Sequence, residues 1–428
     1  MSKLIFYSAL IRLGDTAISL FFVLLTVSVL YMLQRYSAFP FAAEYRLMLY
    51  ALLGVVVLGL RRKLATIPVA FFALGVAVAW SGFHTYHLSD EVLAIHATSR
   101  FGNVMMLAPI ASVLFLHSWQ LEKVFQIFLA VFVLAMATLL YQYWGGDLNR
   151  LVQGYIAIRG DLVRYMTVVG EPNVGGMLAS LVLVLGVTLS KRRLIALLWG
   201  SLAVAFVFLS LSKAAILGVG VGILAGALLY SPNERSEYFL RIAASGITGL
   251  TLMWIIGAED YIRVGMNSVL GAIRGEPSVV EDFQYRQGSI DWNVIFSSPY
   301  IPSWANYLFG ASFYNVGSAA QEIRGPGAGV VLPHNSYLEL FFTGGLLLLG
   351  LVLFLMLRAS YTLFSTRGSE SWQTDRCALI CLTMLSVWML VYPVIYEPVT
   401  GCLLWVIIGY GNRQLKPREA SDASHCHV

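Results

Sequence analysis

Charged residues are scarce in this sequence. They make up 12% of its 428 residues, whereas apolar residues make up 58%. A soluble globular domain carries about a quarter charged residues and close to half apolar ones, and a disordered chain is poorer still in apolar residues. The composition therefore excludes both classes. It predicts a polytopic helical membrane protein in place of the two or three soluble domains that the length alone would suggest.

Several chemical signatures are also missing. The four cysteines, Cys377, Cys381, Cys402 and Cys426, form no CxxC pair and no metal-ligand spacing. Walker A, GxGxxG, HExxH and DxD motifs do not occur. The net charge of +5 is spread between apolar runs and forms no basic stripe. We therefore expect no metal, no cofactor, no nucleotide hydrolysis and no nucleic-acid partner.

Twelve apolar runs are long enough, or nearly long enough, to cross a hydrocarbon core of about 30 Å as helices. They cover residues 17–33, 45–60, 64–82, 101–117, 124–144, 174–190, 194–212, 214–230, 239–257, 337–357, 377–396 and 399–412. The second and the twelfth are short. The fold class expected is all-α, with about twelve transmembrane helices.

The distribution of lysine and arginine predicts the orientation of this bundle. Most of these residues fall in segments that share one side of the membrane with the N-terminus. The positive-inside rule then places both termini in the cytoplasm. Residues 1–257 form an N-terminal bundle of nine spans, 258–336 a large outer loop, 337–412 the last three spans and 413–428 a cytoplasmic tail. Because the outer loop is rich in aromatic residues, we expect it to fold as a cap, with helices at 261–273 and 281–297.

The sharpest local motif is P-H-N-S-Y-L-E, which begins at Pro333, where the outer loop returns to the membrane. A histidine at the water boundary, His334, has a pKa suited to taking a proton from a hydroxyl and returning it. Asn335 and Ser336 are typical of a helix start, with Ser336 the predicted N-cap. Glu339 lies one turn further and is placed to orient polar neighbours. The alternative is that His334 simply caps an interfacial helix.

A second group of candidates is cationic. It comprises Arg286 in the outer loop, Lys213 between two spans, and Arg159 and Arg164 ahead of the sixth span. Cations on the outer side favour an anionic ligand, and an arginine fork suits phosphate oxygens. Snorkelling toward lipid headgroups is the competing interpretation.

A third motif, E-P-N-V-G-G, begins at Glu171 and opens the sixth span. Its glycines permit close backbone approach, and the amides of the helix start could face an anion. The alternative is an ordinary helix start with Asn173 as its cap.

These motifs occur in an order that resembles the O-antigen ligase and O-antigen polymerase family. The resemblance covers residues 150–360 and is carried by E-P-N, by S-x-S-K-A-A, by Arg286, and by H-N-x-x-L-E followed by a glycine pair at Gly344. It implies a GT-C-like integral glycosyltransferase of the bacterial inner membrane, inverting and independent of metal, which acts on the periplasmic face. The implied donor is a glycan on undecaprenyl diphosphate, and the acceptor is a sugar of a second lipid-linked glycan or of the lipid A core. Membrane lipids and a chain-length regulator are further expected partners.

The resemblance also implies roles for individual residues. His334 matches the histidine that activates the acceptor, Arg286 the arginine of the large loop, and Lys213 the cation after S-x-S, where the family usually has arginine. Five further residues are expected to bind the substrate diphosphate or glycan: Arg159, Arg164, Asn173, Asn335 and Glu339. The resemblance does not distinguish a ligase from a polymerase. A secondary transporter of an anionic or lipid-linked substrate is the alternative function, and a membrane scaffold or sensor is a third.

Overall fold

The computed structural model describes residues 2–29, 49–54, 69–88, 101–115, 117–146, 157–159, 161–274, 303–310 and 335–413. These residues are almost entirely helical, with one small hairpin of two antiparallel strands. The all-α fold class predicted from the sequence is therefore confirmed.

The elements before the predicted outer loop are α1 (Ser2–Val29), α4 (Val69–Leu88), α6 (Leu107–Leu114), α7 (Ser118–Tyr143), β1 (Ala157–Arg159), β2 (Leu162–Arg164), α8 (Pro172–Leu189), α9 (Arg193–Ser210), α10 (Lys213–Leu229) and α11 (Pro232–Ile255). They are followed by α12 (Glu259–Arg274), α15 (Ser303–Phe309), α17 (Ser336–Ser365), α18 (Trp372–Trp388), the short 3-10 helix η2 (Val394–Tyr396) and α19 (Pro398–Gly411).

Among the described residues, five helices, α7, α8, α9, α11 and α17, are long and apolar enough to cross a membrane, and five shorter apolar helices accompany them. Large apolar side chains such as Leu194, Leu228 and Trp254 lie exposed on the outside of the bundle. An apolar exterior around an apolar interior is what a lipid environment stabilises. The chain is therefore an all-α membrane protein, while the count of twelve spans remains a prediction.

Helices α8, α9, α10 and α19 match their predicted runs to within two residues at each end, whereas α1, α11 and α17 extend well beyond theirs at one end and the run 377–396 is shifted. Helix α18 begins five residues earlier, at Trp372, and ends at Trp388. Turns and η2 occupy the stretch up to Glu397. Pro393 and Pro398 keep a helix from continuing through this stretch, because proline removes a backbone donor and restricts the residue before it.

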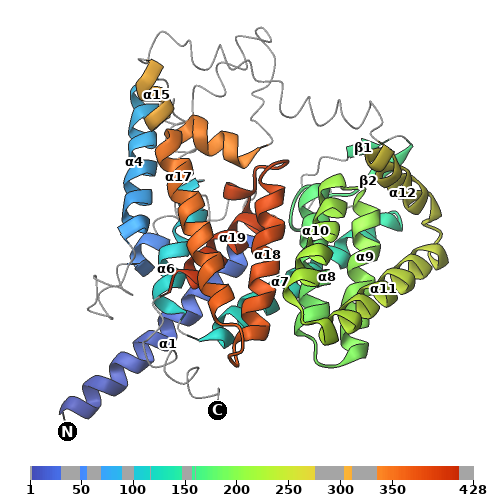
Figure 1. The fold of residues 1–428 in the computed structure, drawn as a ribbon, viewed down its shortest axis with the longest axis horizontal. Coiled ribbons are helices and arrows are strands. Elements are labelled where there is room, and N and C mark those ends of the chain that lie inside the picture. Colours follow the sequence, from blue (N-terminus) through green and yellow to red (C-terminus); the bar gives the residue numbers. More distant parts are fainter. Residues whose placement is uncertain are drawn as a thin grey trace.

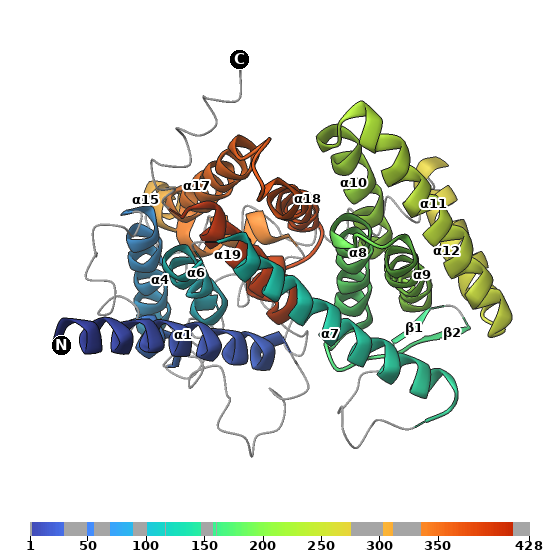
Figure 2. The same ribbon diagram turned by 90° about the horizontal axis from the view of Figure 1, so that it is seen from below.

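The helices form two groups that pack side by side (Figure 1). One contains α8 to α12, and the other contains α1, α4, α6, α17, α18 and α19. Helix α7 crosses from one group to the other, as Figure 2 shows. Packing of α10 on α18 joins the groups directly, and the fully buried ring of Trp388 fits against Gly218 there.

Two ends of this bundle are distinguished below. At the hairpin end, next to β1 and β2, helices α7, α9 and α18 finish and helices α8, α10, α17 and α19 begin. At the opposite end, the Asp375 end, Asp375 is fully buried in the first turn of α18. Residues 145–146, which open the predicted outer segment 145–173, follow α7 at the hairpin end, and α17 begins at the same end.

Helix α17 is broken inside its span. Gly344 and Gly345 have non-helical backbone angles, with φ of +66° at Gly345. Figure 1 shows the two arms meeting at an angle, with α15 beside the break. The hydroxyl of Ser81 on α4 donates to the carbonyl oxygen of Thr343, so protein satisfies part of the backbone that the break exposes. The short arm thus carries Asn335 and Glu339 over the hairpin end.

Helix α12 confirms the predicted helix at 261–273. It follows α11 at the hairpin end, and its Tyr261 hydroxyl donates to the carbonyl oxygen of Val163 in β2 at 2.8 Å. Burial raises the pKa of the Tyr261 hydroxyl, so this donor is protonated at neutral pH. The predicted helix at 281–297 lies outside the described residues.

Candidate functional site

Arg164 is the best-defined cationic residue of the hairpin end. Its Nε donates to the carbonyl oxygen of Ser210 at 2.8 Å, and its Nη2 donates to Oδ1 of Asn173 at 2.7 Å. Ser210 is the last residue of α9 and Asn173 the second residue of α8. Two neutral acceptors on two helices therefore fix the plane of a half-buried guanidinium.

Lys213 lies beside these residues at the start of α10. The chain reverses between α9 and α10 at Leu211, whose φ of +48° makes it the one described non-glycine residue with positive φ. A buried leucine in this conformation costs about 1 kcal/mol, and such strain is found preferentially at functional sites. Ser212 then caps α10, because its Oγ accepts from the amide of Ala215 at 3.2 Å. Lys213 is half-buried as the first residue of that helix.

The start of α17 is also held by hydrogen bonds. Oδ1 of Asn335 accepts hydrogen bonds from the amides of Tyr337 and Leu338 at 3.0 and 3.1 Å. Asn335 is therefore the N-cap, and the prediction that Ser336 caps this helix was wrong. Ser336 is the first helical residue and is fully buried, and Glu339 is buried one turn further along. A carboxylate in the first turn complements the helix dipole.

Glu171 links the start of α8 to the end of α18. It is the N-cap residue of α8 by position, with Pro172 at the first helical position, so Asn173 does not cap this helix as predicted. Its Oε2 accepts from the hydroxyl of Tyr392 at 3.4 Å. Asn173 instead orients Arg164, which gives it a role in the site.

The glycine pair of E-P-N-V-G-G serves packing. A Cβ added at Gly176 would lie 2.5 Å from Oγ of Ser210 and 2.9 Å from Cβ of Ser212. A Cβ at Gly175 would meet the ring of Phe206 at 2.9 Å. The close approach predicted from these glycines is therefore made to α9 and to the turn before α10, which brings Asn173 next to Ser210.

The structure describes little or nothing of the three remaining predicted residues. His334 and Arg286 lie outside the described residues. Arg159 is described as a backbone residue of β1, paired with Leu162, but its side chain is not described. The structure thus brings together Arg164, Asn173 and Lys213 on one side of the hairpin end, and Asn335 and Glu339 on the start of α17.

No protein-family model matches this chain, and no curated protein matches it. The chemistry of the hairpin end therefore has to support any functional assignment.

Two features of the hairpin end were not predicted from the sequence. The hairpin itself was signalled by A-I-R-G-D-L-V-R, where a Gly-Asp pair separates two short runs, a pattern typical of a two-residue turn. The end of α18, which contacts both sides of the site, had no signal, because its contacts are made by backbone carbonyls and by Trp388 in an apolar run.

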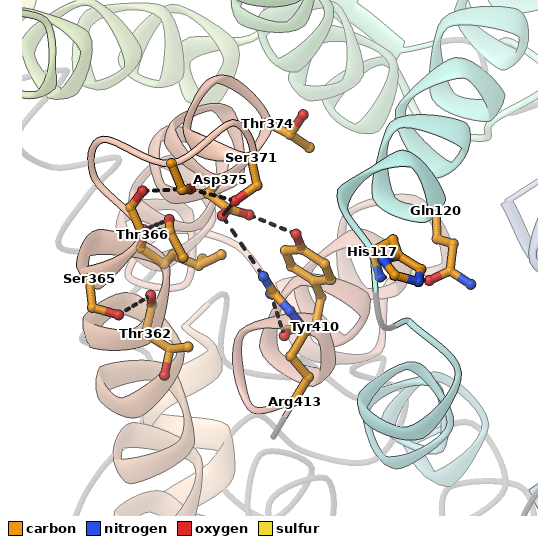
Figure 3. Close-up of polar contacts among 12 residues, drawn as sticks. His117, Gln120, Thr362, Ser365, Thr366, Ser371, Thr374, Asp375, Tyr410 and Arg413 are labelled. Atoms are coloured by element: carbon orange, nitrogen blue, oxygen red, sulfur yellow. Dashed lines mark hydrogen bonds and ion pairs between the residues drawn. The ribbon is translucent and has the colours of Figure 1, made fainter. Parts of the chain in front are cut away.

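A second polar cluster occupies the Asp375 end (Figure 3). Oδ1 of Asp375 accepts from the hydroxyl of Tyr410 at 2.7 Å, Oδ2 accepts from Ser371 at 2.7 Å, and Arg413 lies 3.8 Å away. The neighbours of Asp375 in α18 contact other helices, since Thr374 donates to Glu122 of α7 at 2.6 Å.

Arg376, next in α18, lies 3.1 Å from Glu234 of α11, and its guanidinium stacks on Tyr230. Three consecutive residues of α18, Thr374, Asp375 and Arg376, therefore connect this helix to α7, α19 and α11. Asp375, Arg376 and Arg413 are buried with oppositely charged partners, whereas Glu234 is half exposed, and buried pairs of this kind are typical of a structural anchor. Among the described residues, no group of three or more His, Cys, Asp or Glu side chains is arranged to hold a metal ion.

Proposed function

We propose that this chain transfers a glycan from undecaprenyl diphosphate to a sugar hydroxyl at the outer face of the bacterial inner membrane. The observation that carries the proposal is the convergence of Arg164, Lys213 and the start of α17 at the hairpin end of a membrane bundle. His334 directly precedes Asn335, the cap residue of that helix.

The cationic side of the site suits a diphosphate leaving group. During transfer, the bond between the anomeric carbon and the phosphate oxygen breaks, and negative charge grows on the lipid diphosphate. Fixed cations stabilise that charge most effectively when they need no reorganisation. Arg164 is held by Ser210 and Asn173, and its planar fork matches phosphate oxygens. Lys213 contributes a point charge, and Arg286 is proposed as a third cation.

The other side of the site supplies the base. The acceptor hydroxyl attacks the anomeric carbon with inversion, its oxygen forms the new glycosidic bond, and its proton passes to His334. The proton later leaves the histidine for water or the released diphosphate, so the imidazole is regenerated. Asn335 and the buried Glu339 belong to the rigid first turn that follows this residue, which is the kind of support a catalytic base requires.

The depth of the hairpin end in the membrane also supports a lipid-linked donor. Helix α12 is amphipathic: Tyr261 and Gly265 are buried against the bundle, and its exposed face carries Met266 and Leu270 in one half and Asn267 and Asp260 in the other. Amphipathic helices of this kind lie in the headgroup plane. Tyr261 connects α12 to β2, next to Arg164. Arg164 is therefore proposed to lie at the depth where the diphosphate of a polyprenyl lipid sits.

The charges at the Asp375 end support the proposed orientation. Lysine and arginine gather there, including Lys123, Lys191, Arg192, Arg193 and Arg241. The positive-inside rule assigns such an end to the cytoplasm. The hairpin end then faces the periplasm.

Reconstituted protein tests this function directly. Liposomes that contain the purified chain and a labelled undecaprenyl-diphosphate glycan are offered lipid A core or a second lipid-linked glycan, with and without chelator. We expect labelled glycan to move to one acceptor, at a rate that chelator leaves unchanged. Transfer to the core identifies a ligase, and transfer to the second glycan identifies a polymerase. No product with either acceptor would reject the proposal.

Two variants serve as internal controls for that assay. His334→Ala should abolish transfer while thermal unfolding is unchanged, and Arg286→Lys should impair transfer because a fork becomes a point charge. Full turnover by His334→Ala would remove the proposed base.

One observation favours the alternative of a transporter. Discontinuous helices line the binding sites of many transporters, and α17 is broken at Gly344 and Gly345. Transport sites lie near the bilayer midplane, however, and Figure 1 shows the short arm of α17 lying across the hairpin end, so the break stays at that end of the bundle. Flux of a lipid-linked glycan in liposomes without any acceptor would establish transport instead of transfer.

A further inference from the structure

The end of α18 contacts the cationic side of the site through Trp388. This residue is fully buried, and its indole Nε1 donates to the carbonyl oxygen of Ala214 at 2.7 Å. Ala214 follows Lys213 in the first turn of α10. Gly218, one turn further, makes room for the indole, because a side chain there would overlap the ring. The position of Lys213 is thus tied to α18 by a hydrogen bond and by packing.

The residues next to Trp388 contact the start of α17. The carbonyl oxygen of Met389 accepts from the amide of Ser336 at 2.7 Å, and that of Tyr392 accepts from Oγ of Ser336 at 2.9 Å. One turn before, the carbonyl oxygen of Ser386 accepts from the hydroxyl of Tyr337 at 2.9 Å. The first turn of α17 is therefore attached to α18 by three hydrogen bonds.

The same stretch also contacts α8. The hydroxyl of Tyr392 lies 3.4 Å from Oε2 of Glu171, two residues before Asn173. The amides of Val391 and Tyr392 both donate to the carbonyl oxygen of Trp388, so the stretch is a compact turn with little freedom of its own. One rigid segment, residues 386–392, thus touches the starts of α8, α10 and α17.

We propose that residues 386–392, with Trp388 as the main positioning residue, set the spacing between the donor-binding cations and the helix start that follows His334. This inference rests on the proposed function and extends it. The two sides of the site belong to different helix groups, and residues 386–392 hydrogen-bond to both. Because a transfer reaction needs the attacking oxygen and the anomeric carbon in near-contact, a shift of about 1 Å between the two sides lowers turnover up to about a hundredfold.

A kinetic signature distinguishes positioning from simple stabilisation. Donor binding depends mainly on the cations, and the two that the structure describes, Arg164 and Lys213, lie on the same side of the site. Loosening the segment should therefore lower kcat strongly and change the KM for the donor little. Loss of folded protein would instead lower the amount of active enzyme and leave kcat per folded molecule unchanged.

Trp388→Phe tests the proposal, because phenylalanine fills most of the space but cannot donate to Ala214. Amide hydrogen exchange and steady-state kinetics are measured on the reconstituted full chain. We expect exchange in residues 212–218 and 336–340 to accelerate about fivefold or more, kcat to fall about tenfold or more, and donor KM to change less than about threefold. Tyr392→Phe, which removes only a hydroxyl, is a milder variant with the same direction of effect.

Trp199→Phe is the matched control, since Trp199 also packs against a helix glycine, Gly186, but away from the site. It should leave exchange in both turns and kcat per folded molecule unchanged. Unchanged exchange in Trp388→Phe, faster exchange with unaltered kcat, or an equal kcat loss in the control would each overturn the proposal. If the unsubstituted chain transfers no glycan, the proposed function fails, whereas accelerated exchange in both turns would still establish that α18 couples them.

Discussion

The guanidinium of Arg164 and the side-chain amide of Asn173 lie 2.7 Å apart, from Nη2 to Oδ1. One residue ends the second strand of the hairpin and the other begins α8, so this bond joins a surface hairpin to a buried membrane helix. Because the acceptor is neutral, it orients the guanidinium without compensating its charge.

Asn173→Ala should weaken donor binding. The substitution removes a hydrogen bond to a charged group, a loss of about 1.5 to 3 kcal/mol in other proteins, which corresponds to about a tenfold rise or more in donor KM. Asn267→Ala, an exposed asparagine on α12, is the control and should leave KM unchanged. Steady-state kinetics on reconstituted protein measure both.

Asn173→Asp separates orientation from charge at the same position. Aspartate would still accept from Arg164, but it would also pair with the guanidinium and reduce its attraction for phosphate. We expect donor KM to rise further than in Asn173→Ala. A KM equal to that of the unsubstituted protein would show that Arg164 does not bind the anionic donor.

Gly345→Ala should destabilise the protein and reduce activity. Gly345 has a φ of +66° and a ψ of −164°, a region open only to glycine, and a side chain there would overlap the backbone of Leu308 at the end of α15. Strain of this kind costs about 1 to 3 kcal/mol. Gly350→Ala in the same helix meets no atom within 4 Å and should be neutral or slightly stabilising. Thermal unfolding in detergent compares the two, and equal midpoints would contradict a required helix break.

Asp375→Asn should lower stability without lowering kcat per folded molecule. The substitution leaves Arg413, whose side chain is 5% exposed, without its buried counter-charge. Removing one partner of a buried pair typically costs about 3 to 5 kcal/mol. Asp260→Asn is a matched control, because its 2.6 Å pair with Arg263 is exposed and should contribute about 1 kcal/mol or less. A selective loss of kcat in Asp375→Asn would show that the Asp375 end takes part in the reaction.

The apolar runs predicted most helices because lipid burial requires a stretch of about 20 apolar residues, whatever the helix packs against. Two boundaries depended on contacts that no local pattern encodes. Helix α18 ends at Trp388, where the turn that follows binds Ser336, and α17 breaks at Gly345, where the backbone of Leu308 lies against it. The sequence shows the prolines and glycines but not their partners.

The site was predictable to a similar degree. Lys213, Arg164 and Asn173 were identified as polar residues beside apolar spans, and the structure places all three at one end of the bundle. The link from Asn173 to Arg164 was not predictable, because it depends on a hairpin that folds back over α8. Trp388 could not be predicted for a different reason. A tryptophan in an apolar run is typical of a core or interface position, and only its hydrogen bond to the carbonyl oxygen of Ala214 distinguishes it.

Helix α12 should lie in the bilayer interface with Met266 toward the acyl chains. Met266 and Leu270 are exposed apolar residues, whereas the exposed Asn267 lies about 100° further around the helix from Met266, so the two positions face different directions. Met266→Trp should place an indole where brominated acyl chains quench its fluorescence, and Asn267→Trp should place one in water. The intrinsic tryptophans give a constant background that the unsubstituted protein measures. Equal quenching at both positions would show that α12 does not lie in the interface, and Arg164, which Tyr261 connects to this helix, would then lose its assigned depth at the lipid diphosphate.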